Sequence, residues 1–307
     1  MIRFILKRLL TFIPVLLAII TLTFFMVRIA PGGPFDDERR VPEETLRQLE
    51  ATYNLDAPLY RQYFDYLGGV LQGDLGPSFK KPSRTVREWI LLRLPVSLEL
   101  GAYGLLVALC VGLPAGVLAA TRPNSARDYA PMSLAMAGIC LPNFVLGPLL
   151  VLVFSLWLGW TPVAGWDLPS EKILPSITLG AVYAAYVARL TRGGMLEVLG
   201  QDYIRTARAK GLGELAVVLK HGLRGGVLPV VSYLGPATAG LLTGSFAVEK
   251  IFGVPGLGRE FVEAAFNRDY TMIMGTVLVY ATLVLFLNLA ADVIQALLDP
   301  RVRISPR

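Results

Sequence analysis

The stretch LLTFIPVLLAIITLTFFMV, residues 9–27, decides the fold class of this chain. Its nineteen residues carry no charge, and they are bounded by Lys7 and Arg8 on one side and by Arg28 on the other. About 20 apolar residues in a helix span the roughly 30 Å hydrocarbon core of a bilayer, so this stretch predicts a first membrane span. A secretory signal peptide is the alternative, but its apolar core is usually ~7–15 residues long, which favours an uncleaved anchor.

The rest of the chain shares this apolar character. Of its 307 residues, 54% are hydrophobic and 17% are charged, whereas soluble domains carry about 25% charged residues. The uncharged stretch at 129–166 is too long for one crossing, and we place a single span at 132–158, followed by an interfacial loop. Four more spans are predicted at residues 100–121, 173–188, 225–248 and 270–291. The sequence therefore predicts an all-α integral membrane protein with six transmembrane helices.

The basic residues predict the orientation of these spans. With the N-terminus inside, the inner segments hold nine more basic than acidic residues and the outer segments hold three fewer, which together give the net charge of +6. An excess of Lys and Arg on the cytoplasmic side is typical of membrane proteins. We therefore expect a multi-pass protein with both termini in the cytoplasm. The basic excess is therefore a signal of membrane topology, and we expect membrane lipid but no nucleic acid among the partners.

The inventory of polar residues disfavours several classes of site. His221 is the single His, and Cys110 and Cys140 lie in apolar stretches, so we expect no disulfide, no metal site and no bound cofactor. The sequence lacks the G-x4-G-K-[ST] motif of a P-loop. The middle of each predicted span lacks Asp, Glu, Lys and Arg, which disfavours an ion-coupled carrier and an intramembrane enzyme. We expect a protein without catalytic residues.

A charged segment separates the first two predicted spans. Residues 28–98 contain ten acidic and ten basic residues, and we expect residues 29–98 to form a small extracytoplasmic subdomain. Apolar residues at helical spacing predict helices at 42–53 and 59–71. The segment is either a connector that covers the helix ends or a docking surface for a soluble partner.

A second outer segment precedes the last predicted span. Residues 249–269 include the turn sequence VPGLG, and a short helix at 260–266 is expected to lie along the membrane surface. Its turn residues Pro255, Gly256 and Gly258 form a possible external gate. A capped surface loop is the alternative.

The inner loop at residues 189–224 holds seven basic residues and a pattern typical of a short capped helix. We assign Asp202 as the N-cap, followed by about two turns over residues 203–210. Gly211 comes next, in position for the left-handed conformation that ends many helices. A solvated basic loop attracted to anionic lipid is the alternative.

The two faces of this short helix differ. On a helical wheel, Tyr203, Ile204 and Ala207 share one side, while Arg205 and Arg208 lie on another. Because a two-turn helix has no stability of its own in water, we expect it to need a partner surface.

The segment DYIRTARAKGL, residues 202–212, resembles the conserved cytoplasmic loop of membrane subunits in binding-protein-dependent ABC importers, in its peptide-permease form. That loop usually reads E-A-A-x3-G-x9-I-x-L-P; here RTA at 205–207 replaces E-A-A, Gly211 matches the glycine, and HGLR at 221–224 replaces I-x-L-P. The resemblance implies a coupling helix that binds an ATPase subunit. Its residues would be Asp202, Tyr203, Ile204, Arg205, Thr206, Ala207, Arg208, Ala209, Lys210 and Gly211.

The resemblance extends over almost the whole chain. Four further segments are similar to the B-type permease subunit of oligopeptide and dipeptide importers, at residues 5–35, 53–79, 251–270 and 297–303. The family implies the ABC type I importer permease fold. We accordingly divide the chain into an anchor at 1–28, an extracytoplasmic subdomain at 29–98 and a permease core at 99–307.

The resemblance also implies a function and partners. It describes a permease subunit that moves oligopeptides or dipeptides across a bacterial or archaeal cytoplasmic (inner) membrane; similar importers carry glutathione or nickel chelates. The implied partners are a second homologous permease subunit, two cytoplasmic ATP-binding subunits and an extracytoplasmic peptide-binding protein. An ion-coupled secondary peptide carrier is the alternative function.

Overall fold

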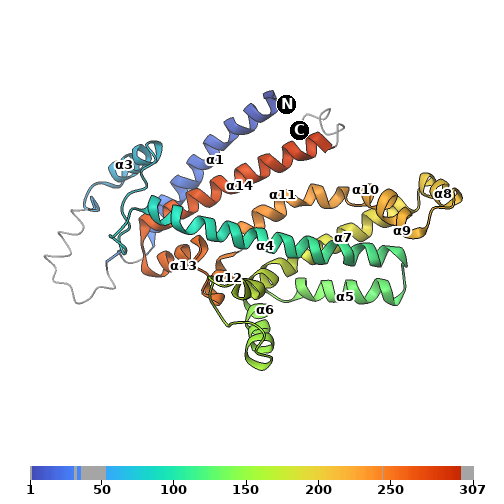
Figure 1. Ribbon diagram of the computed structural model, residues 1–307. Helices are drawn as coiled ribbons and strands as arrows, with labels where there is room; N and C mark the ends of the chain where they lie inside the picture. The colour runs from blue at the N-terminus through green and yellow to red at the C-terminus, as the bar shows by residue number, and fades with distance from the viewer. Residues whose placement is uncertain (1, 31–32, 36–52, 244, 299–307) are drawn as a thin grey trace. The chain divides into compact units, whose positions relative to one another are not determined.

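The computed structural model describes residues 2–30, 33–35, 53–243 and 245–298 (Figure 1). Within these ranges the regular structure is helical, apart from an isolated β-bridge between Pro77 and Thr85. The predicted helix at 59–71 is confirmed with the same bounds, and the predicted helix at 260–266 lies inside a longer one. The helix predicted at 42–53 lies outside the described residues except for its last position.

The helices follow one another in this order: α1 Ile2–Ile29, α3 Leu59–Leu71, α4 Val86–Thr121, α5 Ala126–Cys140, α6 Asn143–Leu150, η1 Val151–Trp157, η2 Pro169–Lys172, α7 Ile173–Leu199, α8 Asp202–Ala209, α9 Glu214–Ala216, η3 Val217–Gly222, α10 Leu223–Gly226, α11 Leu228–Thr243, α12 Ser245–Phe252, α13 Leu257–Asn267 and α14 Tyr270–Leu298. Segments η1 and η3 are π-helical and η2 is a 3₁₀ turn.

Four of these segments are long and apolar enough to cross a membrane. They cover Ile5–Ile29, Val86–Thr121, Pro169–Leu199 and Tyr270–Ile294. Two bent pairs of helices bring the number to as many as six among the described residues if each pair counts as one span. The six predicted spans correspond to this upper count.

The predicted span at 132–158 is interrupted by a bend. The chain bends by 111° between Cys140 and Asn143, so α5 and the α6–η1 segment are separate helices. Pro142 lacks an N–H and disfavours helical geometry at the residue before it, and Leu141 is accordingly extended, with φ −98° and ψ 116°. An uncharged stretch therefore does not guarantee a straight helix.

The predicted span at 225–248 is also interrupted. A bend of 53° separates the helical segment that ends at Gly226 from α11. Gly225 and Gly226 favour the helix poorly, and Pro229 is well placed in the first turn of a new helix. The predicted span at 173–188 is longer than expected, because α7 continues past Arg189 to Leu199.

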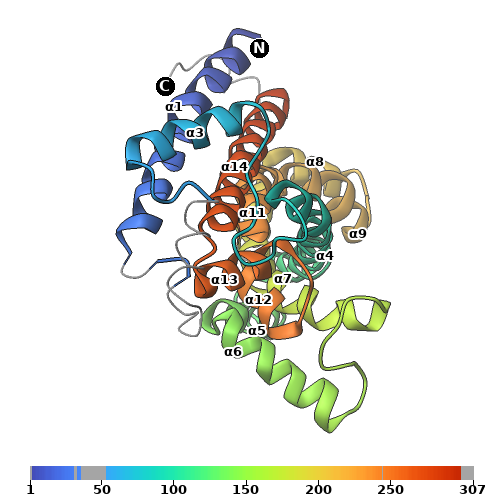
Figure 2. The same cartoon turned by 90° about the vertical axis from the view of Figure 1, so that its left-hand side faces the viewer.

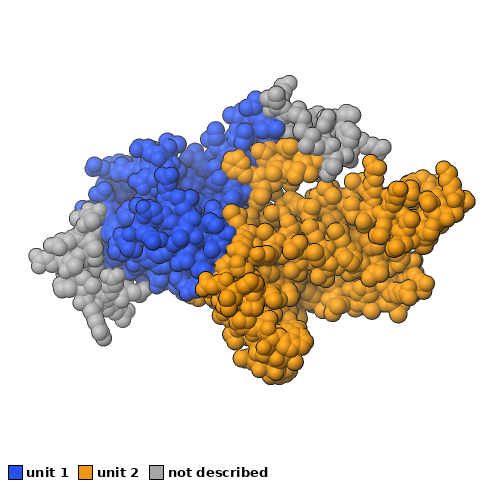
Figure 3. All heavy atoms as spheres, in the orientation of Figure 1, with its two compact units in different colours: residues 1–96, 255–285 blue, residues 97–254, 286–307 orange. Residues whose placement is uncertain are grey.

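The chain divides into two compact units, coloured separately in Figure 3. In the unit of residues 97–254 and 286–307, α7 packs against α5, α6, α10, α11 and α12. Helices α4 and α7 approach closely, because a Cβ added to Gly112 would lie 2.6 Å from the Ala184 carbonyl oxygen. Small residues at such contacts allow helices to pack backbone to backbone.

An ion pair ties α5 to α7 within the same unit. The guanidinium of Arg192 donates two hydrogen bonds to the buried carboxylate of Asp128, at 2.6 and 2.7 Å. Because its charge is paired, Arg192 can lie inside α7, beyond residue 188, where the predicted span ends.

The unit of residues 1–96 and 255–285 has a core of its own. Val86 and Ile90 of α4 pack against Leu257 of α13 and Met272 of α14. Asp269 is the residue immediately before α14. Its buried carboxylate accepts hydrogen bonds from the Ser78 hydroxyl and the backbone N–H of Phe79. This carboxylate therefore fixes the segment before α4 against the start of α14.

Candidate functional site

The short helix predicted in the inner loop is present as α8. It begins one residue earlier than expected, because Gln201, with φ −81° and ψ 156°, is the N-cap and Asp202 is the first helical residue. The Gln201 side chain makes no capping hydrogen bond. Asp202 still places a carboxylate in the first turn, where it interacts favourably with the helix dipole.

The end of α8 depends on Gly211, as predicted. Gly211 has φ +79°, and its N–H donates to the Arg208 carbonyl at 2.9 Å while the N–H of Leu212 donates to the Ala207 carbonyl at 3.4 Å. These two bonds form the Schellman motif, in which a left-handed residue satisfies the last carbonyls of a helix. The chain therefore reverses sharply after α8.

Two apolar side chains hold α8 against its own chain. Ile204 and Ala207 are buried and pack against Val198 at the end of α7 and Val217 at the start of η3. The predicted apolar side is thus confirmed for Ile204 and Ala207, whereas Tyr203 remains 46% exposed. The expected need for a stabilising surface is met in part by α7 and η3.

The opposite side of α8 is exposed and largely polar. Arg205, Thr206, Arg208, Ala209 and Lys210 all face away from the apolar contacts. Arg205 forms an exposed pair with Asp202 at 3.3 Å. This face presents hydrogen-bond donors and positive charge.

Arg208 links α8 to the following turn of helix. Its guanidinium donates to both carboxylate oxygens of Glu214, at 2.6 and 3.1 Å. The Glu214 carboxylate raises the pKa of Arg208 above its ordinary value. Sequence reasoning did not identify Glu214, although a carboxylate six residues after an arginine, across a glycine turn, is a usable signal.

Segment η3 connects this helix to the membrane helices. Val218 of η3 packs against Met195 of α7 and Ala120 of α4, while Val217 contacts α8 residues. A Cβ added to Gly222 would lie 3.1 Å from the Met195 side chain. Segment η3 therefore contacts α8 as well as the long helices α4 and α7.

A buried carboxyl group lies outside the predicted sites. Glu249 of α12 is fully buried and accepts hydrogen bonds from the hydroxyls of Ser97 and Ser245, at 2.7 and 2.8 Å. Glu249 lies one residue after the predicted span at 225–248, so it is not among the charged residues expected inside a span. The available signal for a buried acceptor was the pair of serines, Ser97 and Ser245, in otherwise apolar helices.

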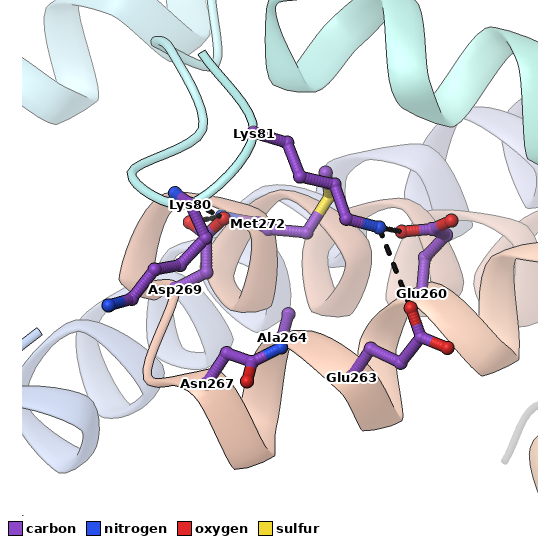
Figure 4. A pocket seen from close by; sticks show the side chains of 8 residues that line it. All are labelled: Lys80, Lys81, Glu260, Glu263, Ala264, Asn267, Asp269 and Met272. Carbon is purple, nitrogen blue, oxygen red and sulfur yellow. Dashed lines mark hydrogen bonds and ion pairs between the residues drawn. The ribbon is translucent and has the colours of Figure 1, made fainter. Parts of the chain in front are cut away.

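The candidate gate residues lie in the other unit, at the start of α13. Gly256 is the N-cap of α13, Gly258 is buried within its first turn, and the carbonyl of Pro255 accepts a hydrogen bond from Arg93 at 3.4 Å. Figure 4 shows Lys81 reaching the Glu260 and Glu263 carboxylates of the same helix. These contacts hold α13 in place through side chains rather than through the turn alone.

The apolar helices and the short helix α8 between α7 and η3 fit a membrane protein of the transport permease class, and comparison with known proteins identifies the family. The family model for the binding-protein-dependent transport system inner membrane component matches residues 112–304. A second family model, for the N-terminal part of such membrane components, matches residues 1–101. The chain belongs to this family of ABC importer permease subunits.

Two relatives match this chain over almost its whole length. The chain is 45% identical to the oligopeptide transport system permease protein OppB of Haemophilus influenzae over 305 residues, which are 99% of this chain and all of that protein. It is equally 45% identical to the dipeptide transport system permease protein DppB of Bacillus subtilis over the whole of both chains.

A solved structure supports the fold. A chain of the MetNI methionine ABC transporter in an inward-facing conformation aligns with a TM-score of 0.57 and 21% identity, covering 68% of this chain and 96% of that one. This likeness shows the shared permease fold.

Proposed function

We propose that this chain is the permease subunit of an ABC importer that moves oligopeptides or dipeptides, and that α8 is the helix through which partner ATPases drive it. The observation that carries the proposal is the two-sided geometry of α8. Ile204 and Ala207 bind it to its own chain, while its polar face stays exposed. The names of the full-length relatives support the substrate class.

The assembly would contain a second homologous permease, two ATP-binding subunits and an extracytoplasmic peptide-binding protein. The excess of Lys and Arg in the predicted inner segments supports a cytoplasmic position for α8 and both termini. Closure of the ATPases would move α8, and because α8 is packed on α7 and η3, the motion would bias the permease between two states.

Charge reversal on α8 tests the ATPase contact. The chain is purified in mild detergent with its partners, and the ratio of ATPase subunit to permease is measured for Arg205→Glu. Arg122→Glu is the matched control, because Arg122 is also an exposed arginine assigned to the inner side but lies outside α8. We expect a lower ratio for Arg205→Glu alone; an unchanged ratio, or an equal loss in both variants, would contradict the assignment.

An ion-coupled peptide carrier is the second candidate, favoured by the buried carboxyl group of Glu249, since carriers of that kind keep ionisable groups inside the membrane. Uptake into proteoliposomes separates the two. In one assay the ATPase subunits are present and ATP is supplied on the α8 side; in the other the ATPase subunits are left out and a proton or sodium gradient is applied. Both assays use peptides of graded length, glutathione and a nickel chelate as substrates. Uptake that requires ATP supports the importer, and uptake driven by the gradient alone would replace it with the carrier.

A further inference from the structure

Helix α3 crosses the first membrane span at a defined depth. The Tyr63 hydroxyl hydrogen-bonds to the Thr21 hydroxyl of α1 at 2.7 Å, and its ring packs edge-on against Phe24, 5.2 Å between centroids. Arg28 donates to the Gln62 side chain at 3.1 Å. These contacts lie within one unit, and Figure 2 shows α3 running across α1 rather than alongside it.

The depth follows from helix geometry. Thr21 lies six residues before Val27, the last residue of the uncharged stretch, which corresponds to about 9 Å along the helix axis. Phe24 lies about 4.5 Å before it on the same scale. The side of α3 that contains Tyr63 is therefore level with the hydrocarbon at the Arg28 end of α1.

The outer side of α3 is divided into two stripes. Tyr60, Phe64 and Leu71 are exposed on one stripe, with Phe64 65% exposed. Arg61 and Asp65 are exposed on the next. At 100° per residue these stripes are separate from the side that contacts α1, so α3 has a protein side, an apolar side and a polar side.

Apolar side chains of α1 are exposed near the same end of the span. Leu22 and Met26 of α1 are largely exposed at the same level, and 17% of the apolar window of α1 is buried inside the structure. A helix with an apolar stripe beside a polar stripe lies in the interface plane, about 5–10 Å into the boundary between headgroups and acyl chains.

We infer that α3 is an interfacial helix whose Tyr60, Phe64 and Leu71 side chains are inserted among lipid acyl chains at the Arg28 end of α1. The occupant of this stripe is lipid rather than a soluble protein. Because Arg61 and Asp65 cancel in charge, insertion depends on apolar area and not on anionic headgroups. The inference goes beyond the proposed transport function and requires only that α1 spans the membrane.

Site-directed spin labelling tests the depth directly. Single cysteines are introduced as Phe64→Cys, Tyr60→Cys, Arg61→Cys and Asp65→Cys in a Cys110→Ala, Cys140→Ala background, and each is labelled with a nitroxide. The transporter is assembled with its partner subunits in nanodiscs of zwitterionic lipid. Accessibility to apolar oxygen is then compared with accessibility to water-soluble NiEDDA.

We expect the oxygen-to-NiEDDA ratio at positions 60 and 64 to exceed that at 61 and 65 several-fold, with no change when anionic lipid is added. High NiEDDA accessibility at all four positions would overturn the inference in favour of a water-facing helix. Shielding of position 64 from both reagents would overturn it in favour of a protein neighbour. The depth measurement does not depend on uptake, so a failure of ATP-driven transport would count only against the proposed function.

Discussion

Helices α8 and α13 are both short and both carry several charges, yet they use those charges in opposite ways. On α8 the apolar pair Ile204 and Ala207 faces the chain and the charges face outward. On α13 the Glu260 carboxylate is buried and forms ion pairs with Lys81 and Arg93. Charge on a short helix therefore does not by itself indicate a binding surface.

The difference concerns what stabilises each helix. An exposed ion pair contributes little to stability, whereas removing one member of a buried pair or a buried acceptor is costly. We therefore expect substitutions around α13 to act mainly on folding and substitutions on the exposed face of α8 to act mainly on partner binding.

The largest effect is expected for Asp269→Ala beside α13. The buried carboxylate accepts hydrogen bonds from Ser78 and from the N–H groups of Phe79 and Met272. Leaving these donors unpaired should cost more than about 2 kcal/mol, measured as a lowered thermal unfolding midpoint of the purified chain. Asp74→Ala is the control, because its carboxylate is exposed and accepts a hydrogen bond from the backbone N–H of Gly76. Equal thermal unfolding midpoints for the two variants would mean that the buried Asp269 carboxylate does not stabilise the fold.

The next effect in size is expected for Gly211→Val on α8. A β-branched residue is strained at φ +79°, at a cost of about 1–3 kcal/mol, so the reversal after α8 should shift and ATP-driven uptake should fall while the protein still inserts. Gly213→Val is the control, since Gly213 has φ −63° and a Cβ there would meet nothing within 4 Å. Normal ATP-driven uptake by Gly211→Val would mean that transport does not depend on the conformation at the end of α8.

Much of this comparison was accessible from the sequence. The capped pattern around Gly211 and the i, i+3 spacing of Ile204 and Ala207 predicted α8, because local backbone and side-chain preferences determine a short helix end. The uncharged stretches predicted where apolar helices lie, because the bilayer requires them.

The remainder depended on long-range contacts. No local pattern shows that Asp128 pairs with Arg192, and this pair allows α7 to continue beyond the predicted span. The burial of Glu249 likewise requires Ser97 from another helix. The bend at Pro142 does have a local signal, because proline disfavours helical geometry at the residue before it.

A smaller effect is expected for Arg208 and Glu214, which connect α8 to the next turn. Arg208→Glu should lower the ratio of ATPase subunit to permease, with a change in stability of no more than about 1 kcal/mol because the pair is exposed. The double variant Arg208→Glu, Glu214→Arg restores an ion pair with its charges exchanged. If the ATPase contacts the cation at position 208, binding should stay weak in the double variant. Full recovery would instead mean that the pair only holds the turn.

The smallest effect is expected for Asp202→Asn, the acidic end of α8. Its side chain is 95% exposed and its pair with Arg205 spans 3.3 Å in contact with solvent, so screening leaves little for the charge to contribute to folding. Asn also retains a side-chain oxygen in the first turn. We therefore expect Asp202→Asn to keep the wild-type thermal unfolding midpoint and the wild-type ratio of ATPase subunit to permease. Arg205→Glu, measured in parallel, should lower that ratio. A loss in Asp202→Asn as large as that in Arg205→Glu would mean that the partner contacts this carboxylate, and that the binding surface of α8 includes its N-terminal end as well as its basic face.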